Sequence, residues 1–142
     1  MKILIPVDGS KISEKIVEAA KKIGEKFDAE LILLNVINDT NLHSEYYSQE
    51  LYNFEFTQSK QILENAKKFL LDYPYKVSTV SKEGTTYLEI INLADEEDVD
   101  LIVVGNRGLG VFSRTLLGSV SNKVLNHAEK AVLVIKAELE ED

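Results

Sequence analysis

Short runs of apolar residues alternate along the chain with stretches in which apolar residues recur every three or four positions. Continuous apolar runs are typical of strands buried on both faces of a parallel sheet, and the longer spacing is typical of amphipathic helices. Continuous runs predict strands at residues 3–7, 31–37, 101–104 and 131–135, and the alternation of valine with Ser78 and Thr79 predicts a short strand at residues 77–80. Strands that alternate with helices form right-handed crossover units, so the chain predicts a three-layer α/β/α domain with a five-stranded parallel sheet.

Local signals place the helix starts. Ser10 is a candidate N-cap for the first helix, and the apolar spacing of the second helix begins near Thr57. The stretch Thr86-x-x-Glu89 reads as a capping box that opens the third helix. Ser119 is predicted to cap the last, short helix.

Residues 38–56 form the least regular part of the chain. They contain tyrosines and polar residues without a convincing period, so the segment is interpreted as irregular and mobile, either a long loop or loosely helical. Two interpretations of this segment are possible: it is a lid over a binding site, or it is a variable insertion that carries surface tyrosines.

Composition narrows the class of protein. The chain has 142 residues, enough for one domain with its own core, and no cysteine, which excludes disulfides and thiolate chemistry. Its formal net charge of −8 argues against binding to nucleic acid or to an anionic membrane. No apolar run has the length of a membrane span or of a signal-peptide core, so we expect a cytoplasmic location.

Residues 105–119 read G-N-R-G-L-G-V-F-S-R-T-L-L-G-S and carry the most distinctive chemistry. They hold four of the seven glycines and the only two arginines, Arg107 and Arg114. Glycine lets a backbone approach a ligand closely, and a helix start favours an anion. The segment therefore predicts a phosphate site, although a long surface connection with glycines in turns is the alternative. Both arginine side chains are open to two interpretations, contact with phosphate or exposure to water.

The spacing Gly105-x2-Gly108-x9-Gly118-Ser119 resembles the nucleotide-binding signature of the universal stress protein family, in its ATP-binding branch. The phosphate motifs G-x-x-x-x-G-K-[ST] and G-x-G-x-x-G are both absent. The resemblance extends over the whole chain, residues 1–142, as a single domain, although Ala131 stands where the family commonly has proline. It implies a Rossmann-like fold, of the adenine nucleotide alpha hydrolase-like type, with strand order 3-2-1-4-5. In that order the first and fourth strands are neighbours, which would bring Asp8 and Gly105 into one cleft.

The resemblance also implies roles for individual residues. Asp8, in the matching segment Pro6-Val7-Asp8, would contact the adenosine portion of the nucleotide; its alternative is a simple Asx-turn. Val36 would offer main-chain groups to adenine, or would be a core residue only. The predicted phosphate-binding residues are Gly105, Arg107, Gly108, Gly118, Ser119, Val120 and Ser121, of which Arg107 is inferred from its charge rather than from the family.

The two histidines do not indicate catalysis. His127 lies near the end of a predicted helix, where a capping or packing role is expected, and His43 has no identifiable partner. Two isolated histidines do not form a zinc site or a catalytic triad. We therefore predict no catalytic residues and no metal ligands.

The last strand, from Ala131 to Ile135, is apolar on both faces yet would lie at the sheet edge. An exposed apolar edge invites pairing, and members of the family commonly dimerise through it. The resemblance thus implies a homodimer paired along this strand.

Three functions follow as hypotheses. The first is an ATP-binding regulator or sensor of the stress response, with a bound adenine nucleotide and an unidentified downstream protein partner. The second is a slow Mg²⁺-dependent ATPase or autophosphorylating protein, with Ser119, Ser121 or Thr115 as phosphate acceptor and Asp8 near the metal. The third is a structural dimer with a vestigial cleft.

Overall fold

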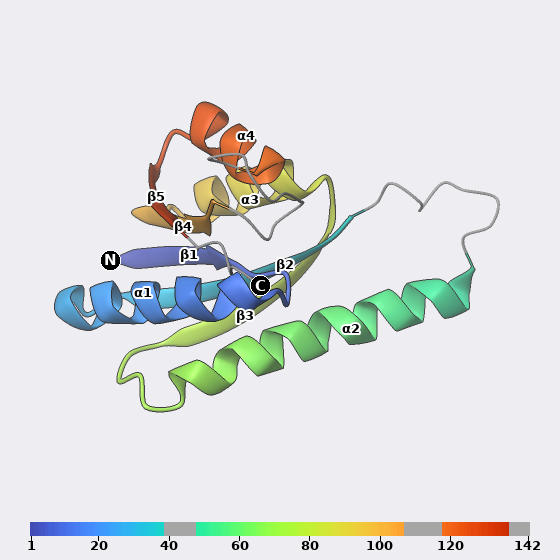
Figure 1. The fold of residues 1–142 in the computed structure, drawn as a ribbon, viewed down its shortest axis with the longest axis horizontal. Coiled ribbons are helices and arrows are strands. Elements are labelled where there is room, and N and C mark those ends of the chain that lie inside the picture. Colours follow the sequence, from blue (N-terminus) through green and yellow to red (C-terminus); the bar gives the residue numbers. More distant parts are fainter. Residues whose placement is uncertain (39–47, 107–117, 137–142) are drawn as a thin grey trace, which may run out of the picture.

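The computed structural model describes residues 1–38, 48–106 and 118–136. Its five strands form one parallel sheet in the order β3-β2-β1-β4-β5, which confirms the predicted order (Figure 1). The strands are β1 (Lys2–Pro6), β2 (Glu30–Asn38), β3 (Val77–Gly84), β4 (Leu101–Gly105) and β5 (Ala131–Ile135). Strand β1 lies at the centre, where Ile3 pairs with Leu31 on one side and Leu101 on the other.

Helices cover both faces of the sheet and complete the predicted three layers. They are α1 (Lys11–Phe27), α2 (Gln49–Lys67), α3 (Thr86–Glu96) and α4 (Ser119–His127), with a single turn of 3₁₀ helix, η2 (Lys68–Leu70), directly after α2. Figure 1 shows α1 and α2 on one side of the sheet and α3 and α4 on the other. None of the helices in the described ranges is long and apolar enough to cross a membrane.

Two apolar clusters hold the layers together, one on each face of the sheet. Because successive side chains of a strand point to opposite faces, Ile3 and Ile5 of β1 belong to the cluster under α1 and α2, and Leu4 belongs to the cluster under α3 and α4. All three side chains have no solvent exposure. Burial of such a side chain stabilises the fold by about 1.5–3 kcal/mol.

Helix α2 begins at Gln49, so the prediction of a start near Thr57 is wrong. Of the two interpretations of residues 49–56, the long loop is wrong, and the structure has helix there. The hydroxyl of Ser48 accepts a hydrogen bond from the N–H of Leu51 at 3.1 Å and caps this start. The first two turns contact the core little, and Phe54 is 64% exposed. They therefore lack the apolar period from which the helix could have been predicted. Residues 39–47 lie outside the described residues.

Two predicted N-caps are displaced by one residue. The N-cap position of α3 is Thr85, not Thr86, and that of α4 is Gly118, not Ser119; no side chain makes a capping bond at either position within the described residues. Thr85 and Gly118 have extended backbones, with ψ of 121° and 164°, whereas Thr86 and Ser119 are the first helical residues. Ser10 is the N-cap of α1 as predicted, although its side chain makes no capping bond.

Strand β3 is longer than predicted and reaches Gly84. It pairs with β2 residue by residue as far as Asn38 opposite Gly84, and this pairing extends the strand beyond its apolar part.

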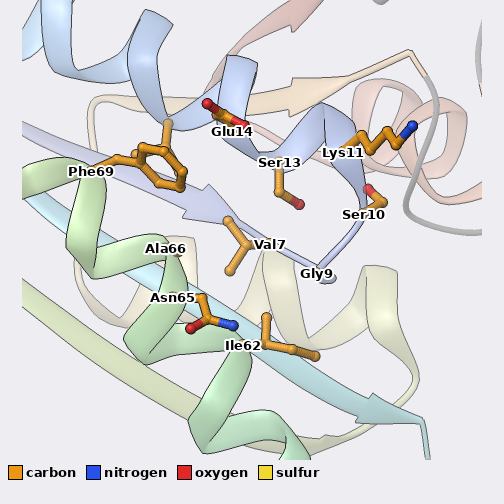
Figure 2. A pocket seen from close by; sticks show the side chains of 11 residues that line it. Val7, Gly9, Ser10, Lys11, Ser13, Glu14, Ile62, Asn65, Ala66 and Phe69 are labelled. Atoms are coloured by element: carbon orange, nitrogen blue, oxygen red, sulfur yellow. The ribbon is translucent and has the colours of Figure 1, made fainter.

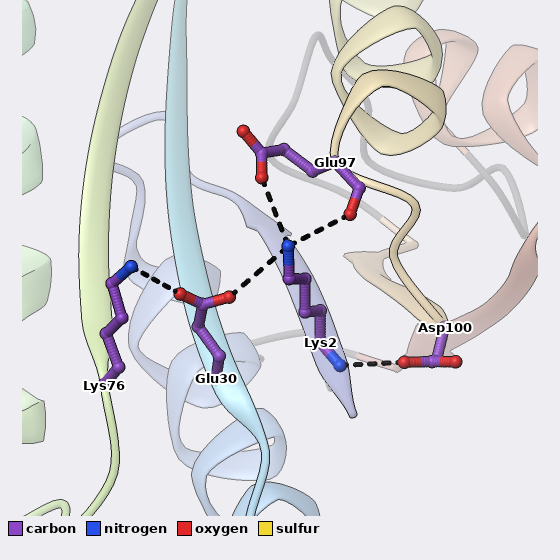
Figure 3. A network of polar contacts seen from close by, with 5 residues as sticks. All are labelled: Lys2, Glu30, Lys76, Glu97 and Asp100. Atoms are coloured by element: carbon purple, nitrogen blue, oxygen red, sulfur yellow. Dashed lines mark hydrogen bonds and ion pairs between the residues drawn. The ribbon is translucent and has the colours of Figure 1, made fainter.

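A network of ion pairs and hydrogen bonds lies at the amino end of the sheet (Figure 3). The Lys2 ammonium lies 3.8 Å from a Glu30 carboxylate oxygen and 3.4 Å from a Glu97 carboxylate oxygen, and it donates to the Glu97 carbonyl. The other Glu30 oxygen lies 3.0 Å from the Lys76 ammonium. The backbone N–H of Lys2 donates to the Asp100 carboxylate at 2.8 Å. This network links the first residues of β1 and β2 to the end of α3.

Candidate functional site

The end of strand β1 is fixed to strand β2 beyond the last paired residue. The N–H of Val7 donates to the Leu34 carbonyl at 2.8 Å, and the Asn35 side-chain amide donates to the Val7 carbonyl at 2.8 Å. Asn35 is 7% exposed. Both backbone polar groups of Val7 are therefore satisfied by β2, which sets the position of the turn that follows.

That turn is built around the carboxylate of Asp8. Its Oδ1 accepts from the Ser10 N–H at 2.9 Å and from the Ser13 hydroxyl at 3.1 Å, and the Asp8 N–H donates to the same hydroxyl at 3.3 Å. Gly9 has φ +82°, a conformation that glycine adopts without strain. The turn is thus an Asx-turn. Within the described ranges, Oδ2 of Asp8 has no hydrogen-bond partner.

The two described ends of the glycine-rich segment meet at the carboxyl end of β4. The N–H of Gly118 donates to the Asn106 carbonyl at 2.7 Å, and the N–H of Asn106 donates to the Ile135 carbonyl at 3.0 Å. The Ser121 hydroxyl donates to the Gly105 carbonyl. These bonds hold the start of α4 against the ends of β4 and β5.

The first turn of α4 carries N–H groups suited to an anion. The N–H groups of Ser119, Val120 and Ser121 have no acceptor in the part of the chain that the structure describes. Such groups carry the positive end of the helix dipole, so a negatively charged group is favoured beside them.

A cavity of about 320 Å³ lies between the β1 turn and the start of α4, on the face of the sheet that α3 and α4 cover. Six predicted site residues line it: Pro6, Val7, Asp8, Val36, Ser119 and Val120. Five further lining residues were not predicted: Leu34, Asn35, Asn38, Thr86 and Ile90. The structure therefore brings the Asp8 segment and the helix start together, although they are more than 100 residues apart in sequence.

The other predicted site residues occupy different positions. Gly105 is the buried last residue of β4, and Gly118 is the buried N-cap of α4. Ser121 is only 1% exposed, and its hydroxyl is engaged by the Gly105 carbonyl. Arg107 and Gly108, like Arg114 and His43, lie outside the described residues.

Two further cavities flank the β1 turn on the opposite face of the sheet. One, of about 440 Å³, shares Asp8, Asn35, Val36 and Asn38 with the first and extends to α2. The other, of about 250 Å³, lies between α1 and α2 (Figure 2). Its lining combines apolar side chains, among them Ile62 and Phe69, with polar ones, among them Ser10 and Ser13, all labelled in Figure 2.

Of the two histidines, the structure describes only His127. His127 is the last residue of α4, and its ring packs beside Tyr87 with centroids 6.0 Å apart, in keeping with the predicted packing role. Among the described residues, no group of three or more histidine, aspartate or glutamate side chains could hold a metal ion.

Comparison with known proteins finds relatives along nearly the whole chain. A model of the universal stress protein family matches residues 1–136. The universal stress protein YxiE of Bacillus subtilis is 33% identical, with 95% of this chain and 98% of YxiE covered. The universal stress protein MJ0577 of Methanocaldococcus jannaschii is 32% identical, with 95% of this chain and 94% of MJ0577 covered.

Solved structures show the same likeness. The structure of MJ0577 has a TM-score of 0.87 and 35% sequence identity, with 96% of each chain covered. A universal stress protein solved in complex with cAMP has a TM-score of 0.74 and 26% identity, again with 96% of each chain covered.

Proposed function

Because the chain belongs to the universal stress protein family, we propose that it is an ATP-binding regulator of the stress response, whose nucleotide occupies the 320 Å³ cavity. One observation carries the proposal: an available carboxylate oxygen of Asp8 and the available N–H groups of α4 border the same cavity. A nucleotide needs an acceptor for its ribose hydroxyls and donors for its phosphates. A related protein was solved with an adenine nucleotide, cAMP.

The cavity suits the adenosine portion of the ligand. Its volume lies at the lower end of the range of small-molecule sites, roughly 300–1,000 Å³. Val36 would offer its main chain to the adenine edge, and Asp8 would accept from the ribose. Pro6 and Val7 would form the wall beside them.

The phosphates would lie at the start of α4. Ser119 and Val120 line the cavity there and present their N–H groups. In the proposed site Ser121 contributes its N–H alone, because its hydroxyl donates to the Gly105 carbonyl, and the Gly118 N–H donates to the Asn106 carbonyl. Gly105 and Gly118 are therefore proposed to shape the backbone beside the phosphates, and Arg107 and Gly108, outside the described residues, remain proposed phosphate contacts. We include Mg²⁺ as a companion of the triphosphate, because this ion is commonly bound through phosphate oxygens and water.

Hydrolysis or autophosphorylation is the alternative for the same site. Ser119 is exposed at the cavity, whereas the Ser121 hydroxyl is engaged by the Gly105 carbonyl. Ser119 is therefore the better-placed acceptor of the two. Asp8 is the one carboxylate among the residues that line this cavity.

We further propose that the protein works in the cytoplasm as a homodimer paired along β5, from Ala131 to Ile135, with an unidentified downstream protein partner. Four of these five residues are partly buried, and β4 is the sheet neighbour of β5 within the chain. Sedimentation at micromolar concentration should give a dimer, and a monomer there would contradict this assembly.

The proposed ligand is tested by mass spectrometry on small molecules released from freshly purified, denatured protein, together with calorimetric titration of ATP and Mg²⁺. Recovered ATP, or saturable binding of ATP, is the expected result. Recovered ADP would favour the hydrolysis alternative. No released nucleotide and no heat with ATP, ADP, AMP or cAMP would contradict nucleotide binding and leave the third hypothesis, a structural dimer.

A further inference from the structure

We propose that Ser13 is a positioning residue, which orients the Asp8 carboxylate so that one of its oxygens recognises the ribose of the bound nucleotide. The proposal rests on the proposed function and adds a residue that would influence which ligand binds. This residue lies outside the 320 Å³ cavity proposed for the nucleotide, called the nucleotide cavity below. Ser13 belongs to the first turn of α1 and is 8% exposed. It lines the α1–α2 cavity of Figure 2 and not the nucleotide cavity.

Ser13 and Asp8 hold each other through two hydrogen bonds that share one hydroxyl. The hydroxyl donates to Oδ1 of Asp8 at 3.1 Å and accepts from the Asp8 N–H at 3.3 Å. A serine hydroxyl has one donor and two acceptor positions, so this arrangement uses it in both directions. The Asp8 side chain is thereby tied to its own backbone and to the helix.

The turn itself is anchored on both sides of Asp8. Asn35 of β2 fixes the Val7 carbonyl, and the Ser10 N–H gives Oδ1 a second donor at 2.9 Å. Oδ1 of Asp8 thus accepts two hydrogen bonds from within the protein, one from the Ser10 N–H and one from the Ser13 hydroxyl. Since Asp8 lines the nucleotide cavity, the oxygen left to meet a ligand there is Oδ2.

An ionised carboxylate only accepts hydrogen bonds, and the 2′ and 3′ hydroxyls of ribose are neighbouring donors. Bonds to a charged acceptor are stronger than neutral ones, and an acceptor already held in place does not need to be ordered when the ligand binds. The geometry therefore favours a ribonucleotide over the same nucleotide without ribose hydroxyls. Without the Ser13 hydroxyl, only the Ser10 N–H would hold Oδ1, and the ligand would have to complete the ordering of the Asp8 carboxylate.

The test measures dissociation constants by calorimetry for ATP and for 2′,3′-dideoxy-ATP. For the natural chain, dideoxy-ATP should bind at least about tenfold more weakly than ATP. In Ser13→Ala, the ratio of the dissociation constant of dideoxy-ATP to that of ATP should fall more than threefold. The ratio of the dissociation constants of AMP and ATP should stay the same, because the phosphates bind at α4. Ser13→Thr keeps the hydroxyl, and its methyl group has the α1–α2 cavity beside it, so it should restore the ratio.

Ser10→Ala is the matched control. It makes the same substitution in the same turn, but the Ser10 hydroxyl is buried without a hydrogen-bond partner in the described part of the chain, and the Ser10 N–H remains. This variant should keep the natural ratio. Thermal unfolding of each variant confirms that the comparison is between folded proteins.

The outcomes distinguish failure of the proposed nucleotide binding from failure of the proposed role of Ser13. If the natural chain binds no adenine nucleotide, the proposed function fails and this inference fails with it. If ATP binds but the natural chain does not distinguish it from dideoxy-ATP, only the inference is overturned. The inference would also be overturned if the ratio of the two dissociation constants in Ser13→Ala stayed within threefold of the natural value. The same holds if this ratio fell equally in Ser10→Ala and Ser13→Ala.

Discussion

The two ends of the parallel sheet use their polar groups in opposite ways. At the amino end, the charged groups of Lys2, Glu30, Lys76 and Glu97 are paired with one another (Figure 3). At the carboxyl end, Oδ2 of Asp8 and the first N–H groups of α4 have no partner within the described ranges, and a cavity lies between them. Polar groups at the amino end thus stabilise the fold through pairing, whereas those at the carboxyl end border the cavity of the proposed ligand.

The topology produces this asymmetry. In a parallel sheet with crossover helices, each crossover leads from the carboxyl end of a strand toward the start of a helix, so helix N-termini gather there. The strand order then places β1 next to β4, and the helices that follow these two strands, α1 and α4, lie on opposite faces of the sheet. A cleft opens where they part. Stability and ligand binding should consequently respond to substitutions at different ends.

The largest effect is expected at the carboxyl end, from Ser119→Asp. The new carboxylate would lie in the first turn of α4, where it repels a phosphate group, and ATP should bind about 30-fold more weakly or worse, a loss of about 2 kcal/mol. The same charge interacts favourably with the helix dipole, so the free energy of unfolding should not fall. Calorimetric titration and chemical denaturation measure the two quantities.

Ser119→Asn is the matched control for that substitution, because it has nearly the same size without the charge. It should retain ATP affinity to within about fivefold, the loss expected for one neutral hydrogen bond. Equal ATP affinities for the aspartate and asparagine variants would show that the phosphates do not lie at the start of α4.

The converse effect is expected at the amino end, from Glu30→Gln. The Glu30 side chain is 19% exposed and faces the ammonium groups of Lys2 and Lys76. The neutral amide of glutamine would form no ion pair with either ammonium group. The free energy of unfolding should fall by about 1 kcal/mol, with a smaller loss at high salt. Chemical denaturation at two salt concentrations measures this change.

ATP affinity is the control in this experiment, and Glu30→Gln should leave it unchanged. A clear weakening of ATP binding in this variant would mean that the two ends of the sheet are coupled, which would break the comparison.

The smallest effect concerns the pH dependence of the ion pair between Asp98 and Lys130. A hydrogen bond from the Lys130 ammonium lowers the pKa of Asp98 below its ordinary value of 3.8. A carboxylate with a lowered pKa stabilises the folded state above its unfolded pKa, and this contribution disappears as the pH falls through the folded pKa.

The test compares the natural chain with Asp98→Asn, since asparagine also tolerates the φ of +49° at this position. Their free energies of unfolding should differ slightly near pH 6 and converge as the pH falls below the ordinary Asp pKa. A difference that is constant between pH 2 and pH 6 would exclude the ion pair as its cause.

Much of the fold could be predicted because its physical signal is local. Buried parallel strands need continuous apolar runs, and β5 spans the predicted residues 131–135 without change. The start of α2 could not be predicted in this way, because its first turns lie outside the core and carry no apolar period. Thr85 and Thr86 are equally suited to an N-cap, so only the backbone conformation decides between them.

The site could be predicted only in part, since some of its residues are defined by contacts between distant segments. The family resemblance pointed to Asp8, Val36 and Ser119, which line the cavity. Asn35 had a weak signal, a polar residue inside an apolar strand, but its role depends on the position of the Val7 carbonyl. Thr86 reaches the cavity from α3, and nothing in its own segment indicates this.

The most direct test of the central claim is a crystal structure of the protein grown with ATP and Mg²⁺. We expect adenosine in the cavity on the α3 and α4 side of the sheet, with ribose hydroxyls on Oδ2 of Asp8 and phosphates at the first turn of α4. A nucleotide seated in the α1–α2 cavity of Figure 2, or bound away from the carboxyl ends of β1 and β4, would contradict it.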